Sequence, residues 1–258
     1  MSQIFAACNQ KGGVGKTTTV INLAAYLAAL GKHVLLIDLD PQGNATSGLG
    51  LEKEKIEQCI YNVLNGEVEI NQAIKTTQIV GLDLIPATSD LAGAEVELVA
   101  ELGRETKLKS VIESIKDKFD FILIDCPPSL SLLTINALTA ADEVIVPVQC
   151  EYYALEGLSR LMETLDLIKT RLNPSLKIKG ILLTMYDSRT IISQQVAQEA
   201  RHHFNDLVFK TVIPRNVRLA EAPSFGQPII LYDKSSAGAA AYESLSKEVI
   251  NHAQTGTW

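Results

Sequence analysis

The 258-residue sequence lacks several features that define large classes of protein. It holds one Trp, four scattered Cys and no uncharged apolar run of 18 residues. The cysteines form no C-x-x-C pair, so neither a structural zinc site nor a redox pair is expected. The missing apolar run argues against a membrane-spanning helix, and the N-terminus lacks the pattern of a signal peptide. We therefore expect a cytosolic protein whose thiols stay reduced.

An excess of positive charge is also missing. The chain carries 23 Lys and Arg against 30 Asp and Glu, for a net charge of −7. This balance argues against a nucleic-acid-binding protein. The distribution is uneven, however, because residues 160–220 contain ten Lys or Arg and five Asp or Glu. One part of the surface is therefore expected to be basic, although ordinary solvated helix charge explains the same count.

The sequence does have a glycine-rich segment at residues 9–18, NQKGGVGKTT, directly after the apolar run 4–8. Its three glycines allow a tight turn whose backbone N–H groups point at phosphate oxygens; they are Gly12, Gly13 and Gly15. The helix expected after the segment adds its positive N-terminal end to the same anion site. The order of strand, loop and helix predicts a phosphate-binding loop rather than a turn without a ligand.

The general phosphate-loop pattern is G-x-x-x-x-G-K-[ST], and here Gln10 replaces its first glycine. In that pattern Lys16 bridges the terminal phosphates and the Thr17 hydroxyl binds Mg²⁺. The run KGGVGKTT at residues 11–18 resembles the deviant loop of the ParA/MinD class of ATPases, which has a second lysine, here Lys11. The resemblance implies a nucleotide site that includes the whole run: Lys11, Gly12, Gly13, Val14, Gly15, Lys16, Thr17 and Thr18.

Continuous apolar runs predict strands buried on both faces of a parallel sheet. They lie at residues 4–8, 34–38, 82–86, 121–125, 144–148, 181–185 and 208–213. Helices are expected over residues 16–30, 155–172 and 237–252, whereas the irregular segment 44–81 is a candidate mobile flap. The alternation predicts an α/β fold, with a single doubly wound, mostly parallel β-sheet flanked by helices. We expect one domain over residues 1–258.

Three aspartates follow two of these apolar runs. Asp38 and Asp40 end the run at 34–38, and Asp125 ends the run at 121–125. Carboxylates at strand ends face the same crevice as the phosphate loop, and Asp125 is placed like a Walker B aspartate that holds Mg²⁺. Asp38 and Asp40 alternate along an extended chain, so they are expected to point in different directions. A helix cap or turn is the alternative role for each.

Together with residues 213–232, IPRNVRLAEAPSFGQPIILY, these segments resemble the ParA/Soj chromosome- and plasmid-partition ATPases over essentially the whole chain. The resemblance implies a Mg²⁺-dependent ATPase that dimerises with two ATP molecules sandwiched between the subunits. Lys11 would reach the phosphates of the partner subunit, and Asp40 would orient the attacking water. Asp38 would belong to the nucleotide site. The adenine pocket would be lined by Pro214 and Asn216, with Met185 nearby.

The resemblance also implies that the ATP-bound homodimer binds double-stranded DNA without sequence preference. Arg189 and Arg218 match the positions assigned to that contact, although a solvated loop charge is the alternative for Arg189. A ParB-type centromere-binding protein is the implied partner that stimulates hydrolysis, and the protein would associate with the nucleoid. Because the loop begins about ten residues from Met1, no N-terminal helix-turn-helix is expected.

A membrane-cycling ATPase of the MinD type is the alternative function. It requires a C-terminal amphipathic helix rich in Lys or Arg, whereas residues 246–258 carry one Lys and one Trp. A metal carrier resembling the nitrogenase iron protein would need cysteines paired across a dimer. A biosynthetic ligase such as dethiobiotin synthetase is not favoured, because the run DLDPQG at 38–43 resembles the partition family.

Overall fold

One seven-stranded sheet runs through the part of the computed structural model that is described, residues 2–151 and 154–255. Its strand order is β3-β4-β2-β5-β1-β6-β7, and all neighbours pair in parallel except the edge strand β3, which is antiparallel to β4. The strands are β1 (Gln3–Ala7), β2 (Val34–Asp38), β3 (Lys75–Thr76), β4 (Leu82–Ile85), β5 (Phe121–Asp125), β6 (Glu143–Gln149) and β7 (Lys177–Thr184).

Helices connect the strands and extend beyond the last one. The α-helices are α1 (Lys16–Ala29), α2 (Asn44–Gly48), α3 (Ile60–Leu64), α4 (Ile70–Ala73), α5 (Leu91–Glu97), α6 (Lys107–Glu113), α7 (Leu132–Ala140), α8 (Ala154–Arg171), α9 (Ile191–Phe204), α10 (Val217–Glu221), α11 (Ile229–Tyr232) and α12 (Ala237–Thr255). Short 3₁₀ turns are η1 (Lys53–Lys55), η2 (Leu98–Ala100), η3 (Arg104–Thr106), η4 (Lys116–Lys118), η5 (Asn205–Leu207) and η6 (Ala222–Phe225).

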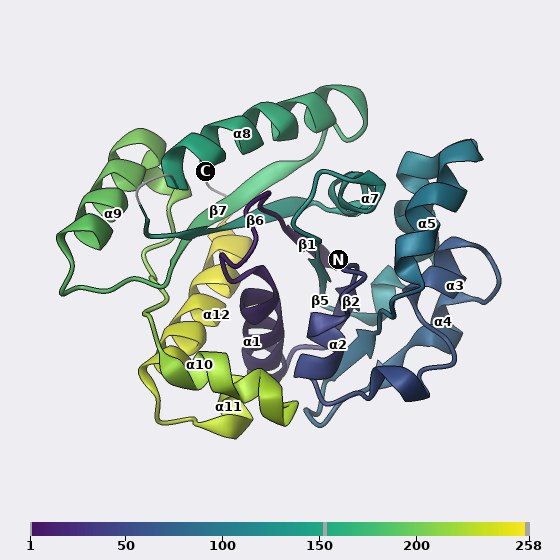
Figure 1. Ribbon diagram of the computed structural model, residues 1–258, viewed down its shortest axis with the longest axis horizontal. Coiled ribbons are helices and arrows are strands. Elements are labelled where there is room, and N and C mark those ends of the chain that lie inside the picture. Colours follow the sequence, from purple (N-terminus) through teal and green to yellow (C-terminus); the bar gives the residue numbers. More distant parts are fainter. Residues whose placement is uncertain (1, 152–153, 256–258) are drawn as a thin grey trace.

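The sheet is covered on both faces, so it has two hydrophobic cores. One face packs against α1 and α12 together with α2, α10 and α11, and the other packs against α3 to α9. Figure 1 shows α1 and α12 side by side under the sheet, with α8 and α9 on the opposite side. Central strands such as β2 and β5 are buried along their whole length. This is the doubly wound α/β architecture expected from the continuous apolar runs.

The prediction of a strand at residues 208–213 was wrong. The segment runs beside β7, with backbone hydrogen bonds from Phe209 N to Ile181 O (3.0 Å) and from Ile213 N to Leu183 O (2.8 Å). Between them, the carboxylate of Glu248 accepts hydrogen bonds from the backbone N–H groups of residues 210 and 211. Those donors are therefore turned toward α12, and the ladder is interrupted although the apolar residues remain buried.

The irregular segment 44–81 is more ordered than a flap. It contains three short helices and the edge strand β3, and its apolar side chains enter the core. Ile60, Leu64 and Ile70 are each at most 2% exposed. Sequence periodicity missed these helices because each is only four or five residues long. In the C-terminal tail, the lone Trp258 lies outside the described residues.

Candidate functional site

The three central strands end at the same level. Ala7 of β1 and Asp38 of β2 both pair with Asp125 at the end of β5. The loop after β1 and the acidic residues after β2 and β5 therefore lie at one edge of the sheet. This is the carboxyl edge at which open α/β sheets bind ligands.

The glycine-rich loop is anchored to the neighbouring strands. The Asn9 side chain donates to the carbonyl of Pro147 on β6 (2.7 Å) and accepts from the backbone N–H of Lys11 (3.0 Å). The Thr184 hydroxyl at the end of β7 donates to the carbonyl of Val14 (2.8 Å). Gly15 has a φ of 89°, a left-handed conformation that glycine adopts without strain, and α1 begins at the next residue. These contacts fix the loop relative to β6 and β7.

The two lysines of the loop are placed differently. Lys16 is 7% exposed, and its ammonium lies 3.4 Å from the carbonyl of Lys11, inside the curve of its own loop. Lys11 is exposed and forms an ion pair with Glu151 at 3.0 Å, in which both side chains are about half exposed. One lysine therefore serves the loop itself, whereas the other points its charge toward the outside.

Asp125 is a fully buried carboxyl group at the end of β5. Both of its oxygens are inaccessible, and neither meets the geometry of a hydrogen bond to the described residues. Burial raises its pKa well above the ordinary value, and the nearby charge of Asp38 raises it further, while the Thr17 hydroxyl acts in the opposite direction. A buried acid with two unused oxygens is the kind of group that a cation would satisfy.

Thr17 and Asp125 are suited to Mg²⁺. They supply a hydroxyl and a carboxylate, the hard oxygen ligands that this ion prefers. Within the described ranges, no three His, Cys, Asp or Glu side chains are arranged to hold a metal ion by themselves.

Asp38 and Asp40 are both buried, and they point to different partners, as expected. Asp38 accepts hydrogen bonds from the backbone N–H and the hydroxyl of Thr46 (2.8 and 2.7 Å) and from the Asp40 N–H (3.2 Å). Burial raises the pKa of Asp38 to about 6, and the bonds from Thr46 oppose that rise. Asp40 accepts from the N–H of Gln42 (2.9 Å). Asp38 therefore fixes α2 against β2, and Asp40 retains an oxygen for other contacts.

A cavity of about 300 Å³ lies beside the phosphate loop. Pro214 and Asn216, the residues predicted for the adenine pocket, line this cavity together with Met185. The backbone of Met185 is in a left-handed conformation, with a φ of 51°. The remaining walls are Gly15, Thr18, Thr184, Ile213, Arg215, Leu219, Ala220 and Tyr242. The side chain of Asn216 also accepts a hydrogen bond from the Arg218 N–H and so begins α10. The loop and the segment 213–220, distant in sequence, thus form one pocket.

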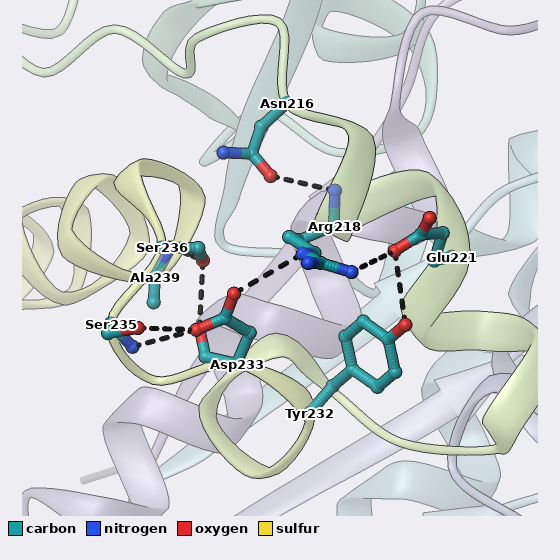
Figure 2. Close-up of polar contacts among 8 residues, drawn as sticks. All are labelled: Asn216, Arg218, Glu221, Tyr232, Asp233, Ser235, Ser236 and Ala239. Carbon is teal, nitrogen blue, oxygen red and sulfur yellow. Dashed lines mark hydrogen bonds and ion pairs between the residues drawn. The ribbon is translucent and has the colours of Figure 1, made fainter.

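The two arginines predicted to bind DNA lie on the surface and do not line this cavity. Arg189 binds both carboxylate oxygens of Asp187 (2.9 and 2.8 Å), and its side chain is 86% exposed. Arg218 is 54% exposed and is also paired with carboxylates (Figure 2). The basic region 160–220 is less basic at the surface than its composition suggests, because Lys179 is buried in an ion pair with Glu143.

Several residues of the site carry no recognisable signal in the sequence. Thr46 follows the run at 38–43 by three residues but is not part of it, and its hydroxyl binds Asp38. Thr184 and Tyr242 lie far from any motif, yet Thr184 anchors the loop and Tyr242 lines the cavity. Glu151 was missed because its contact with Lys11 spans 140 residues.

The four cysteines are buried and free, which leaves them as core residues. In the described residues, no helix is both long enough and apolar enough to cross a membrane.

Comparisons with known proteins agree with this geometry. A family model described as an AAA domain matches residues 2–178. The sporulation initiation inhibitor protein Soj of Bacillus subtilis is 60% identical over 249 residues, which cover 96% of this chain and 98% of Soj. The chromosome partitioning protein ParA of Myxococcus xanthus is 54% identical over 250 residues, 97% of this chain and 88% of ParA. The chain belongs to the ParA/Soj family of partition ATPases.

A solved structure supports the nucleotide chemistry of the ParA/Soj fold. A protein described as cobyrinic acid a,c-diamide synthase from Mycobacterium smegmatis, with a bound ATP analogue and magnesium, superimposes with a TM-score of 0.88. It is 40% identical, and the match covers 100% of this chain and 98% of that one. The prediction of a ParA/MinD-type phosphate-loop fold is confirmed, and so is the expectation of ATP and Mg²⁺ as ligands of this fold.

Proposed function

We propose that this ATPase acts in chromosome or plasmid partition as a nucleotide-controlled dimer that binds DNA. Two subunits would close around two ATP molecules, and the closed dimer would bind double-stranded DNA without sequence preference. A ParB-type protein would stimulate hydrolysis and so return the subunits to the monomeric state. The protein would work in the cytosol on the nucleoid.

The position of Lys11 is the observation that carries this proposal. Lys16 is buried inside its own loop, whereas Lys11 is exposed beside it and held by an ion pair that water can reach. An exposed pair of this kind contributes little, so Lys11 can leave Glu151 when a stronger anion approaches. The triphosphate of a second subunit would be such an anion. Loss of the γ-phosphate on hydrolysis would weaken this attraction and loosen the dimer.

The other residues take roles that follow from their placement. The loop N–H groups and Lys16 would bind the phosphates, and the cavity lined by Pro214 and Asn216 would hold the adenosine. Thr17 and Asp125 would hold Mg²⁺, which neutralises charge on the phosphates. Asp40 would orient the attacking water, because its buried carboxylate lies at the carboxyl edge of the sheet near the loop.

Two other functions are less well supported. The family resemblance to the Mycobacterium smegmatis synthase is weaker, at 40% identity, than the 60% shared with Soj. A MinD-like membrane cycle would depend on the C-terminal tail, where the sequence has little positive charge. Binding to anionic lipid vesicles with ATP, but not to DNA, would favour that alternative.

Co-sedimentation with DNA tests the proposal directly. The wild-type protein would be measured with ATP, with ADP and without nucleotide, at two salt concentrations, while size-exclusion chromatography follows its dimerisation. We expect DNA binding only with ATP, and a steep loss of affinity at the higher salt concentration. A protein that stays monomeric with ATP, or that binds DNA equally in all three states, would refute it. Added ParB-type protein should raise the ATP turnover rate.

A further inference from the structure

Arg218 carries two carboxylate partners from its own chain. Its Nη1 donates to Glu221 Oε2 at 2.9 Å, one turn along α10, and its Nε lies 3.5 Å from Asp233 Oδ2 at the end of α11. Figure 2 shows the guanidinium between these two acids. The Nη1 and Nε groups, through which an arginine can also bind a phosphate, are therefore both paired with carboxylates.

Both carboxylates are held in place by other donors. Glu221 Oε2 also accepts a hydrogen bond from the Tyr232 hydroxyl (3.1 Å), and the Tyr232 ring stacks on Phe225 with centroids 5.0 Å apart. Asp233 Oδ1 accepts from the backbone N–H and the hydroxyl of Ser235 (3.1 and 2.7 Å). The acids are thus preorganised acceptors, so only the arginine side chain has to be ordered when the pairs form.

We propose that Glu221 and Asp233 form an intramolecular clamp that competes with DNA phosphate for Arg218 and so lowers the affinity of the DNA-binding surface. This inference rests on the proposed DNA contact of Arg218. In the free protein the two carboxylates bind Arg218, so a DNA phosphate must displace them before it can bind the guanidinium. Arg189 is likewise paired with a carboxylate of its own chain, that of Asp187. A weak intrinsic affinity suits a protein that must leave DNA when its dimer opens.

The expected size of the effect follows from the exposure of the clamp. The side chains of Arg218 and Glu221 are 54% and 40% exposed, and exposed pairs change an equilibrium by about two- to fivefold. Because a dimer presents two clamps, Glu221→Gln should tighten DNA binding by about four- to twenty-five-fold. Tyr232→Phe keeps the ring and removes one donor to Glu221, so it should tighten binding by less.

The control variant is Asp206→Asn. Asp206 on η5 is exposed, lies in the same basic region of the sequence and does not bind Arg218. It therefore measures the general effect of removing one negative charge per subunit. The affinity for a DNA duplex of fixed length would be measured by fluorescence anisotropy with ATP, for each variant alone and combined with Arg218→Ala. ATP-dependent dimerisation and thermal unfolding without DNA would be followed in parallel, and both should stay as in the wild type.

The combined variants separate the clamp from the DNA contact. The clamp predicts that Glu221→Gln tightens binding more than Asp206→Asn does, and that this excess disappears in the Arg218→Ala background. An affinity of Glu221→Gln equal to that of Asp206→Asn would overturn the clamp, because Glu221 would then have only a general charge effect. A weaker affinity would also overturn it, because Glu221 would then orient Arg218 for DNA. If Arg218→Ala alone leaves DNA binding unchanged, the proposed DNA contact itself is wrong.

Discussion

Replacement of Lys11 by Ala should separate stability from assembly. In the structure Lys11 makes an ion pair with Glu151 in which the two side chains are 47% and 51% exposed. A pair in contact with water contributes about 0.2–1 kcal/mol, so the free energy of unfolding of the monomer should fall by no more than about 1 kcal/mol. Lys16 remains, so the affinity for ATP should be largely kept. The ATP-dependent dimer, by contrast, should be lost.

Analytical ultracentrifugation with and without ATP, together with urea unfolding of the nucleotide-free protein, would measure the two effects. Glu151→Ala breaks the same ion pair but keeps Lys11, and it therefore reports what the ion pair alone contributes. A Lys11→Ala variant that dimerises with ATP as the wild type does would refute the role in the partner site. A loss of more than about 2 kcal/mol in stability would show that the lysine is structural, contrary to its exposure.

Four further variants test other parts of the structure. Lys16→Ala removes the cation inside the loop and should weaken ATP binding by about tenfold to a hundredfold in equilibrium dialysis, and unchanged affinity would count against it. Asp40→Ala should keep ATP binding and the dimer but lower the turnover rate by about a hundredfold or more, as a phosphate-release assay would show. Glu143→Ala should cost about 3–5 kcal/mol in urea unfolding, because it leaves the ammonium of Lys179 buried and unpaired. Lys179→Met should cost less, since the carboxylate it leaves is 15% exposed to water.

The sequence predicted the parts of the molecule that local patterns determine. Uninterrupted apolar runs located six strands of the sheet, and glycine spacing located the phosphate loop. The failed strand at 208–213 has the same apolar pattern, but Glu248, from a helix about 40 residues later, takes two of its backbone donors. The orientation of the Asp38 carboxylate likewise depends on the hydroxyl of Thr46, which donates a hydrogen bond to it. No local sequence pattern predicted this hydrogen bond. Side-chain hydrogen bonds between separate elements determine such details, and hydrophobic periodicity does not predict them.

Helix α1 connects the loop to the surface segment that carries Arg218. Its first residue is Lys16 of the phosphate loop, and further along the side chain of Asn22 accepts a hydrogen bond from the backbone N–H of Ile229 at 2.7 Å. The hydroxyl groups of Thr19 and Tyr242 lie 3.3 Å apart and join α1 to α12, and Tyr242 also lines the cavity. Helix α1 and apolar residues of the segment 213–232 therefore share one hydrophobic core, which also contains Tyr242 of the cavity wall. A ligand that contacts both the loop and the cavity wall would therefore touch the first turn of α1 and also the segment 213–220, which leads into α10.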